Sequence, residues 1–143
     1  MAVALSGCGA TGPRTPDLSR LPLVPGARIA LQVRVCDTGA NSYCGWEVVV
    51  VAPGYRDSDL LLTLERRHLK KLGWSAATGD IGSEHAADSP GHRLRLSYAT
   101  PTQDLQGVDL GFIRRSRPVT LALSRAFFEH VPTLSMLLEV GAY

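Results

Sequence analysis

Residues 28–51, RIALQVRVCDTGANSYCGWEVVVV, decide the fold of the chain. From Ile29 to Val35 every second residue is apolar, which is the period of a strand with one buried face. The run of four valines that ends at Val51 predicts a second, more deeply buried strand. The connection over residues 37–43 is rich in Asp, Gly, Asn and Ser, which favour turns. The stretch therefore predicts a β-hairpin.

A helix is expected directly after this hairpin. Asp57 or Ser58 can cap a helix that runs to about Leu72, and Gly73 then ends it. On a helical wheel the leucines share one broad side and the basic residues share the other, so the helix is predicted to lie on a sheet. The expected buried leucines are Leu60, Leu61, Leu62, Leu64, Leu69 and Leu72, and the opposite face carries Arg66, Arg67, Lys70 and Lys71.

Further strands and a second helix complete the expected fold. Residues 73–79 predict a third strand, residues 79–92 a loop, and residues 93–98 a strand of alternating apolar and polar residues. Pro118 is allowed in the first turn of a helix. The apolar spacing of that helix is interrupted at Pro132 and is expected to resume through Leu134, Leu137 and Leu138. The order β-β-α-β-β-α predicts an α+β two-layer sandwich, in which an antiparallel sheet carries helices on one face.

The start of the chain carries a different signal. The tetrapeptide LSGC at residues 5–8 resembles the lipobox of bacterial lipoproteins, in which the cysteine is joined to diacylglycerol and the bond before it is cut. The resemblance implies that residues 1–7 are the remnant of a signal peptide and that Cys8 carries a lipid. Residues 8–26 hold four prolines without apolar periodicity, which predicts a flexible tether. Residues 27–143 are then a single folded domain.

Two interpretations of this tetrapeptide stay open. Seven residues precede Cys8, whereas an export signal has an apolar region of roughly 7–15 residues. Either translation starts upstream of Met1, or the chain is a cytosolic α+β domain in which LSGC occurs by chance. We favour the first, because a tether-like segment follows the cysteine. The chain is also loosely similar to small lipoproteins of actinobacterium-like organisms in its helix ending Leu-Gly-Trp and its use of Arg over Lys.

The other two cysteines bear on the same question. If Cys8 is lipidated, Cys36 and Cys44 remain as a pair on facing arms of the hairpin, and an even remainder in an exported protein indicates a disulfide. A bridge over so small a loop contributes roughly 2–3 kcal/mol. A zinc site is the alternative, but it needs four ligands, and the spacing of these two cysteines is not that of a structural zinc knuckle.

Composition excludes several classes of protein. The chain has 143 residues, of which 45% are apolar and 20% charged, as expected of one folded domain. A net charge of +2 is too small for a nucleic-acid binder. The basic clusters lack interleaved aromatic residues, so we interpret them as solvated surface. No apolar stretch approaches the roughly 20 residues of a membrane-spanning helix, so membrane contact is expected through a lipid.

Candidate ligands for a metal gather in the segment predicted to be a loop. They are Asp80, Glu84, His85, Asp88 and His92. Asp and His mixtures bind zinc or manganese, but these acids do not follow the alternating spacing of a calcium loop. Glu65 and His68 have the spacing of a metal-binding Glu-x-x-His pair without matching ligands on other helices. We favour a polar surface loop in the first case. In the second we favour a partly buried Glu and His at the edge of the apolar face, hydrogen-bonded to the sheet or to each other.

No catalytic motif stands out. The chain has no Gly-x-Ser-x-Gly elbow, no phosphate loop and no dinucleotide fingerprint. We therefore expect a non-catalytic, lipid-anchored domain on the outer face of the cytoplasmic membrane, without a cofactor, that binds a protein, an envelope component or a small ligand. The alternative is a small metal-dependent or hydrolytic enzyme that uses residues 80–92.

Overall fold

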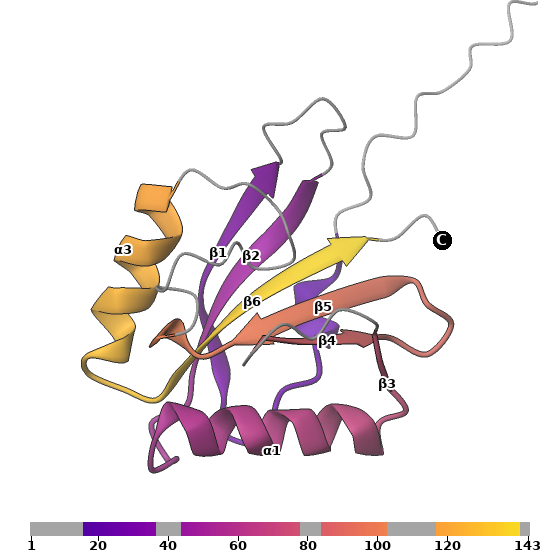
Figure 1. The fold of residues 1–143 in the computed structure, drawn as a ribbon, viewed down its shortest axis with the longest axis horizontal. Helices are drawn as coiled ribbons and strands as arrows, with labels where there is room; N and C mark the ends of the chain where they lie inside the picture. Colours follow the sequence, from indigo (N-terminus) through magenta and orange to yellow (C-terminus); the bar gives the residue numbers. More distant parts are fainter. Residues whose placement is uncertain (1–15, 37–43, 78–83, 103–116, 141–143) are drawn as a thin grey trace, which may run out of the picture.

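A computed structural model describes residues 16–36, 44–77, 84–102 and 117–140. Over these ranges the chain forms one antiparallel sheet in the order β1-β2-β6-β5-β4-β3, with two helices packed on it (Figure 1). The predicted α+β class is thus confirmed. The elements are a short 3-10 helix η1 (Leu18–Arg20), β1 (Arg28–Cys36), β2 (Cys44–Val51), α1 (Ser58–Lys71), β3 (Ser75–Ala76), β4 (His85–Asp88), β5 (Leu94–Ala99), α3 (Arg117–Phe128) and β6 (Thr133–Val140).

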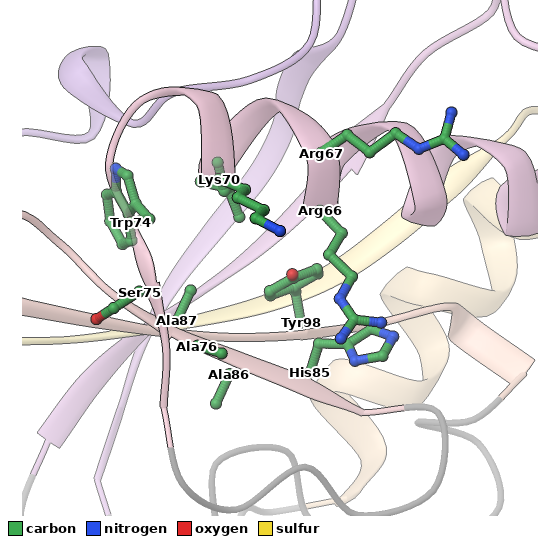
Figure 2. Close-up of a pocket in the computed structure, with 11 residues that line it drawn as sticks. Arg66, Arg67, Lys70, Trp74, Ser75, Ala76, His85, Ala86, Ala87 and Tyr98 are labelled. Carbon is green, nitrogen blue, oxygen red and sulfur yellow. The ribbon is translucent and has the colours of Figure 1, made fainter.

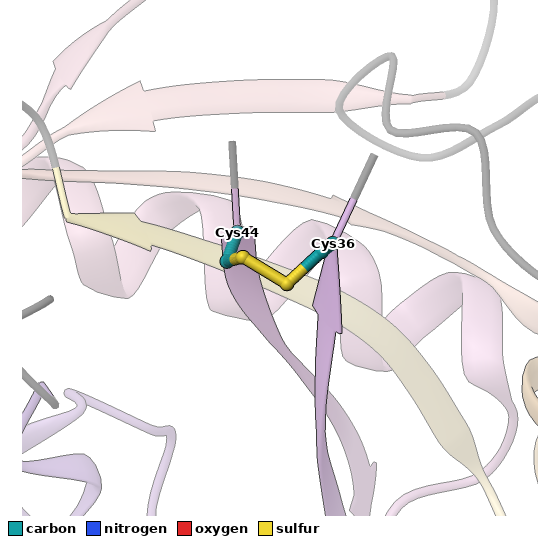
Figure 3. The surroundings of a disulfide bond; sticks show 2 residues. All are labelled: Cys36 and Cys44. Carbon is teal, nitrogen blue, oxygen red and sulfur yellow. A yellow bond between two sulfur atoms is a disulfide. The ribbon is translucent and has the colours of Figure 1, made fainter. Parts of the chain in front are cut away.

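The predicted hairpin is present as β1 and β2. The two strands pair from Arg28 opposite Val51 to Cys36 opposite Cys44. These two cysteines form a disulfide that joins the ends of the strands (Figure 3). Their Cα atoms lie 3.9 Å apart, inside the limit of about 7 Å beyond which a bridge cannot form. The predicted pairing of the cysteines is therefore present in the structure.

The last strand, β6, corrects the prediction that a helix resumes after Pro132. Leu134, Leu137 and Leu138 lie in β6, which pairs with β2 and β5 in the middle of the sheet. Every residue from Thr133 to Leu138 is at most 1% exposed. A strand that is buried on both faces has a continuous apolar run instead of an alternating one. Periodicity cannot distinguish such a short run from a segment of a buried helix, which explains the wrong prediction.

A second strand, β4, lies inside the segment that the sequence predicts to be a loop. It pairs with β3 on one side and with β5 on the other, from His85 opposite Tyr98 to Asp88 opposite Arg95. The four residues HAAD include none of the β-branched residues that are enriched in strands. Pairing with neighbouring strands, and not local propensity, therefore makes this segment a strand.

The two helices lie on opposite faces of the sheet, which differs from the expected single covered face. Leu134 and Met136 of β6 belong to the same buried cluster as Leu61 of α1. Between them, Ser135 forms a side-chain hydrogen bond of 2.8 Å with Ser124 of α3. Because consecutive side chains of a strand point to opposite faces, β6 contacts a different helix on each side.

Helix α1 begins and ends as predicted, but its buried face is centred elsewhere. Asp57 caps the helix by accepting a hydrogen bond of 2.7 Å from the Leu60 N–H, and Gly73 follows it with φ +82°. The buried side includes Glu65 at 0% exposed, whereas Leu72 is 49% exposed. The buried residues of this helix are Ser58, Leu61, Leu62, Glu65 and Leu69.

The folded unit begins before residue 27, which corrects part of the predicted tether. Leu21 and Val24 are buried in the main core. The Val24 N–H donates a hydrogen bond of 2.9 Å to the Glu65 carboxylate, and the Tyr55 hydroxyl donates one of 2.8 Å to the Pro25 carbonyl. The apolar residues between the prolines thus pack against the core, and this proline-rich segment belongs to the folded unit from residue 16 onward. Residues 8–15 lie outside the described ranges.

Leu69 of α1 and Leu72 at its C-cap give a matched test of the helix's orientation. Leu69→Ala removes a side chain that is 1% exposed, so it is expected to lower the free energy of unfolding by roughly 2–5 kcal/mol. Leu72→Ala makes the same chemical change at a position that is 49% exposed and is expected to cost far less. Urea denaturation measures both values. Equal losses in the two variants would mean that this face of the helix is wrongly assigned.

Glu65 makes stability depend on pH. Burial raises the pKa of its carboxyl to about 7 from 4.5, although the Val24 N–H bond opposes the shift. The folded state therefore holds this proton more tightly, and the associated stability is full below pH 4.5 and is lost as the pH rises through 7. Glu65→Gln does not ionise, so it is expected to remove up to roughly 3 kcal/mol of the decline between pH 5 and 8.

Denaturation curves at several pH values test this prediction. Burial also raises the pKa of Glu139 to about 7, so some decline is expected to persist in Glu65→Gln. The control is Glu129→Gln, because the Glu129 side chain is 62% exposed. An unchanged pH slope in Glu65→Gln, or the same flattening in Glu129→Gln, would contradict the assignment.

Candidate functional site

The predicted metal ligands do not form one site among the described residues. Asp80 lies outside those residues, and Glu84 is buried beside the start of β4. The Asp88 carboxylate accepts two hydrogen bonds from the Arg95 guanidinium, at 2.8 and 3.1 Å. These bonds are the main cause that holds the pKa of Asp88 below its usual value, while its burial opposes them. His92 approaches the same carboxylate at 3.7 Å.

Two acidic side chains, Asp88 and Glu139, lie beside Arg95 on this face of the sheet. Arg95 is directly opposite Glu139 on the neighbouring strand β6. Burial raises the pKa of Glu139 to about 7, the Arg95 charge lowers it, and the charges of Glu84 and Asp88 raise it further. Arg95 therefore serves as the countercharge of Asp88 and Glu139, which gives one of the predicted ligands, Asp88, a structural role.

His85 lies on the other side of β4. Along that strand His85 alternates with Ala86, and Ala87 belongs to the core beneath α1. The His85 ring lies 5.6 Å from the Tyr98 ring, measured between centroids, at an angle of 47°. His85 and Asp88 thus point to opposite faces. The parts of the chain that the structure describes contain no group of three His, Cys, Asp or Glu side chains placed to hold a metal ion.

A pocket of about 440 Å³ lies between α1 and the edge of the sheet formed by β3, β4 and β5 (Figure 2). Its size is within the range of about 300–1,000 Å³ that small-molecule sites occupy. It is lined by Arg66, Arg67, Leu69, Lys70, Trp74, Ser75, Ala76, His85, Ala86, Ala87 and Tyr98. One predicted candidate, His85, is therefore part of a cavity, although with partners that the sequence does not indicate.

The pocket combines positive charge with aromatic rings. Figure 2 shows Lys70 and Arg66 extending from α1 toward the strands, while Arg67 extends away along the helix. Trp74 and Tyr98 are 9% and 2% exposed, so packing holds both rings in place. No carboxylate is among the residues of the described chain that line it. The sequence suggests that the basic face of α1 is solvated surface. In the structure, part of this face also forms one wall of a cavity.

The positions of the two aromatic residues in this pocket differ in how well the sequence predicts them. Trp74 directly follows the glycine that ends α1, so its position near the last helical turn is local information. Tyr98 reaches His85 through the pairing of β4 with β5. That pairing depends on a strand that the sequence does not reveal, so the aromatic partner of the basic residues is hidden from sequence analysis.

Comparisons of the chain with models of protein families, with curated proteins and with solved structures found no match. The chemistry of the site therefore rests on its own residues. No helix within the described ranges combines the length and the apolar character needed to cross a membrane.

Proposed function

We propose that this chain is an extracytoplasmic binding domain, held at the cytoplasmic membrane by a lipid on Cys8, that acts without catalysing a reaction. The observation that carries the proposal is the disulfide between Cys36 and Cys44. Disulfides persist in oxidising compartments, whereas cytosolic thiols are kept reduced. With that pair accounted for, Cys8 is the remaining cysteine of the chain and is available for a lipid.

The packed segment from residue 16 onward limits how far a lipid anchor would let the domain move. Eight peptide units separate Cys8 from Pro16. A chain spans at most about 3.5 Å per residue when fully extended, so the start of the folded unit would lie within roughly 28 Å of the lipid attachment. A domain on so short a connection is suited to ligands at the membrane surface.

The lining of the pocket favours binding over catalysis. Cationic side chains and an imidazole can hold a ligand by charge and hydrogen bonds, beside the small accessible parts of two buried aromatic rings. The alternative enzyme would use residues 80–92 as metal ligands. Asp88 is instead bonded to Arg95, and His85 points to the other face of the sheet. The geometry therefore supports the binding function better than the metal-dependent one.

The disulfide gives a direct test of the compartment. The protein is isolated from its native host without reductant and is unfolded in the presence of a thiol-alkylating reagent. Cys36 and Cys44 are expected to remain unlabelled. The same sample reduced first is the control and should label at both. The double variant Cys36→Ser, Cys44→Ser is expected to lose roughly 2–3 kcal/mol of stability. Labelling of both cysteines without reductant would contradict export.

The lipid anchor is tested on the chain expressed from its own gene with a tag after Tyr143. We expect it to sediment with membranes and to have a mature terminus at Cys8 whose mass includes a diacylglyceryl group. Each buried methylene contributes about 0.8 kcal/mol to anchoring, so Cys8→Ser should leave the membrane fraction or stay unprocessed. The double variant at Cys36 and Cys44 is the control and should stay attached.

A different result would refute the anchor. A soluble cytosolic protein whose mass includes residues 1–7 and an unmodified Cys8 would show that the resemblance to a lipobox is a coincidence.

A further inference from the structure

We propose that residues 16–27 form a strap that opens from the domain as a unit when the pH rises, and that Glu65 of α1 is the residue that controls it. The inference goes beyond the proposed binding function, because it concerns the connection between the folded domain and the N-terminal end of the chain. Three features carry it: the attachment of the strap, the burial of Glu65 and the charges around Glu65.

The strap is attached to the domain by few polar contacts. The Val24 N–H donates a hydrogen bond of 2.9 Å to the Glu65 carboxyl. The Tyr55 hydroxyl donates one of 2.8 Å to the Pro25 carbonyl. Among the described residues, these two hydrogen bonds are the ones that join the strap to the rest of the chain. The strap is not part of the sheet, so it can open locally while the strands stay paired.

Side-chain packing supplies the remaining attachment. Leu21 and Val24 are 9% and 5% exposed and belong to the main buried cluster. Three further apolar side chains of the strap are partly buried against that cluster. The strap ends at Gly26, where a φ of +82° turns the chain before β1 begins at Arg28. This turn separates the strap from the paired backbone of the sheet.

Glu65 is the polar residue that the strap covers. Its side chain is 0% exposed, and the strap supplies its hydrogen bond through Val24. Its other oxygen, Oε1, is buried without a hydrogen-bond partner. A buried charge is costly unless it is paired or fully hydrogen-bonded, so this site suits the neutral acid better than the carboxylate. The pKa of Glu65, which burial raises to about 7, agrees with this geometry.

No charge on the described residues offsets the cost of ionising Glu65. On the side that faces α1, β6 presents Leu134, Met136 and Leu138, and β3 consists of Ser75 and Ala76. The titratable and charged groups on the elements around Glu65 are Asp17 and Arg20 of the strap, Tyr55 before α1, Arg66 and His68 of α1, and His85 and Tyr98 of the strands. None of them shifts the pKa of Glu65, because its causes are burial and the Val24 N–H.

Ionisation of Glu65 therefore favours the open strap. Opening exposes the carboxyl to water, where its pKa returns from about 7 to 4.5. The open form thus loses its proton at a lower pH than the closed form. Opening does not depend on pH below 4.5, becomes more favourable between 4.5 and 7, and levels off above 7. Between pH 5 and 8 the equilibrium constant for opening is expected to rise about 70-fold.

Opening lengthens the connection to the membrane, a consequence that rests on the lipid anchor proposed above. With the strap closed, the extended chain from Cys8 to Pro16 spans roughly 28 Å. With the strap open, twenty peptide units separate Cys8 from Arg28, and the extended chain spans roughly 70 Å. The domain thus reaches farther from the membrane at neutral pH than at acid pH.

Amide hydrogen exchange of the full, oxidised chain measures the opening. Exchange is followed by NMR from pH 5 to 8 and is corrected for the intrinsic rate at each pH. The amides of Val24 and Ala27 report on the strap, and those from Leu134 to Leu138 report on global unfolding. In the wild type we expect the opening constant of the strap to rise about 70-fold, and at pH 8 to exceed the global one at least tenfold.

Three variants separate Glu65 from other causes. Glu65→Gln has a similar shape but does not ionise, so the opening constant of its strap should change less than about twofold over the same pH range. Glu129→Gln is the control at a side chain that is 62% exposed and should keep the full rise. Tyr55→Phe removes the second hydrogen bond and should raise opening about fivefold at every pH without changing the pH dependence.

Three results would overturn the proposal. They are an opening constant of the wild-type strap that does not rise with pH, exchange of the strap only together with Leu134 to Leu138 at every pH, and a rise in Glu65→Gln as large as in the wild type. The wild-type profile decides the first two without any variant. Because the measurement does not depend on the lipid or on where the protein resides, its failure would leave the lipid anchor and the disulfide standing.

Discussion

The pairing of β6 with both of its neighbours holds the structure together. Met136 lies opposite Val48 of β2 on one side and opposite Tyr98 of β5 on the other. The disulfide-bonded hairpin and the group β3–β4–β5 are joined in the sheet through this strand. Its residues from Thr133 to Leu138 are buried on both faces, where the strand contacts α1 on one side and α3 on the other. Each half of the sheet thus depends on the last strand of the chain.

This arrangement places the candidate site. Helix α1 leaves β2, crosses the face that Leu134 and Met136 help to form, and delivers the chain to β3 at the far edge (Figure 1). Its buried side packs on the core and includes Glu65, whose carboxylate accepts a hydrogen bond from Val24 of the N-terminal segment. The side that remains exposed is basic, and its last turns overhang the strand edge. A pocket with cations above and rings below follows from that crossing.

Local features of the fold could be predicted from the sequence. The alternation in β1 and the valines of β2 act within a few residues of themselves, and both predict the strands that the structure contains. The cap of α1 is also local, and the structure selects Asp57 from the two candidates Asp57 and Ser58. The disulfide is also local, because a short turn brings Cys36 opposite Cys44.

Features that depend on distant partners could not be predicted. β4 is a strand because β3 and β5 pair with it, and β6 is a strand because β2 and β5 do. Glu65 is buried because Val24, far away in sequence, satisfies part of its carboxylate. His85 was identified from the sequence as a candidate, but its partner Tyr98 follows from the pairing with β5.

Amide hydrogen exchange of the oxidised protein tests most directly whether β6 joins the two halves of the sheet. A strand paired on both sides and buried on both faces should open only when the whole domain unfolds. The account predicts that the amides from Leu134 to Leu138 are among the slowest to exchange and that their exchange follows the global free energy of unfolding. Rapid exchange in these amides, with slow exchange persisting in β1 and β2, would show that the hairpin is stable without β6 and would contradict the account.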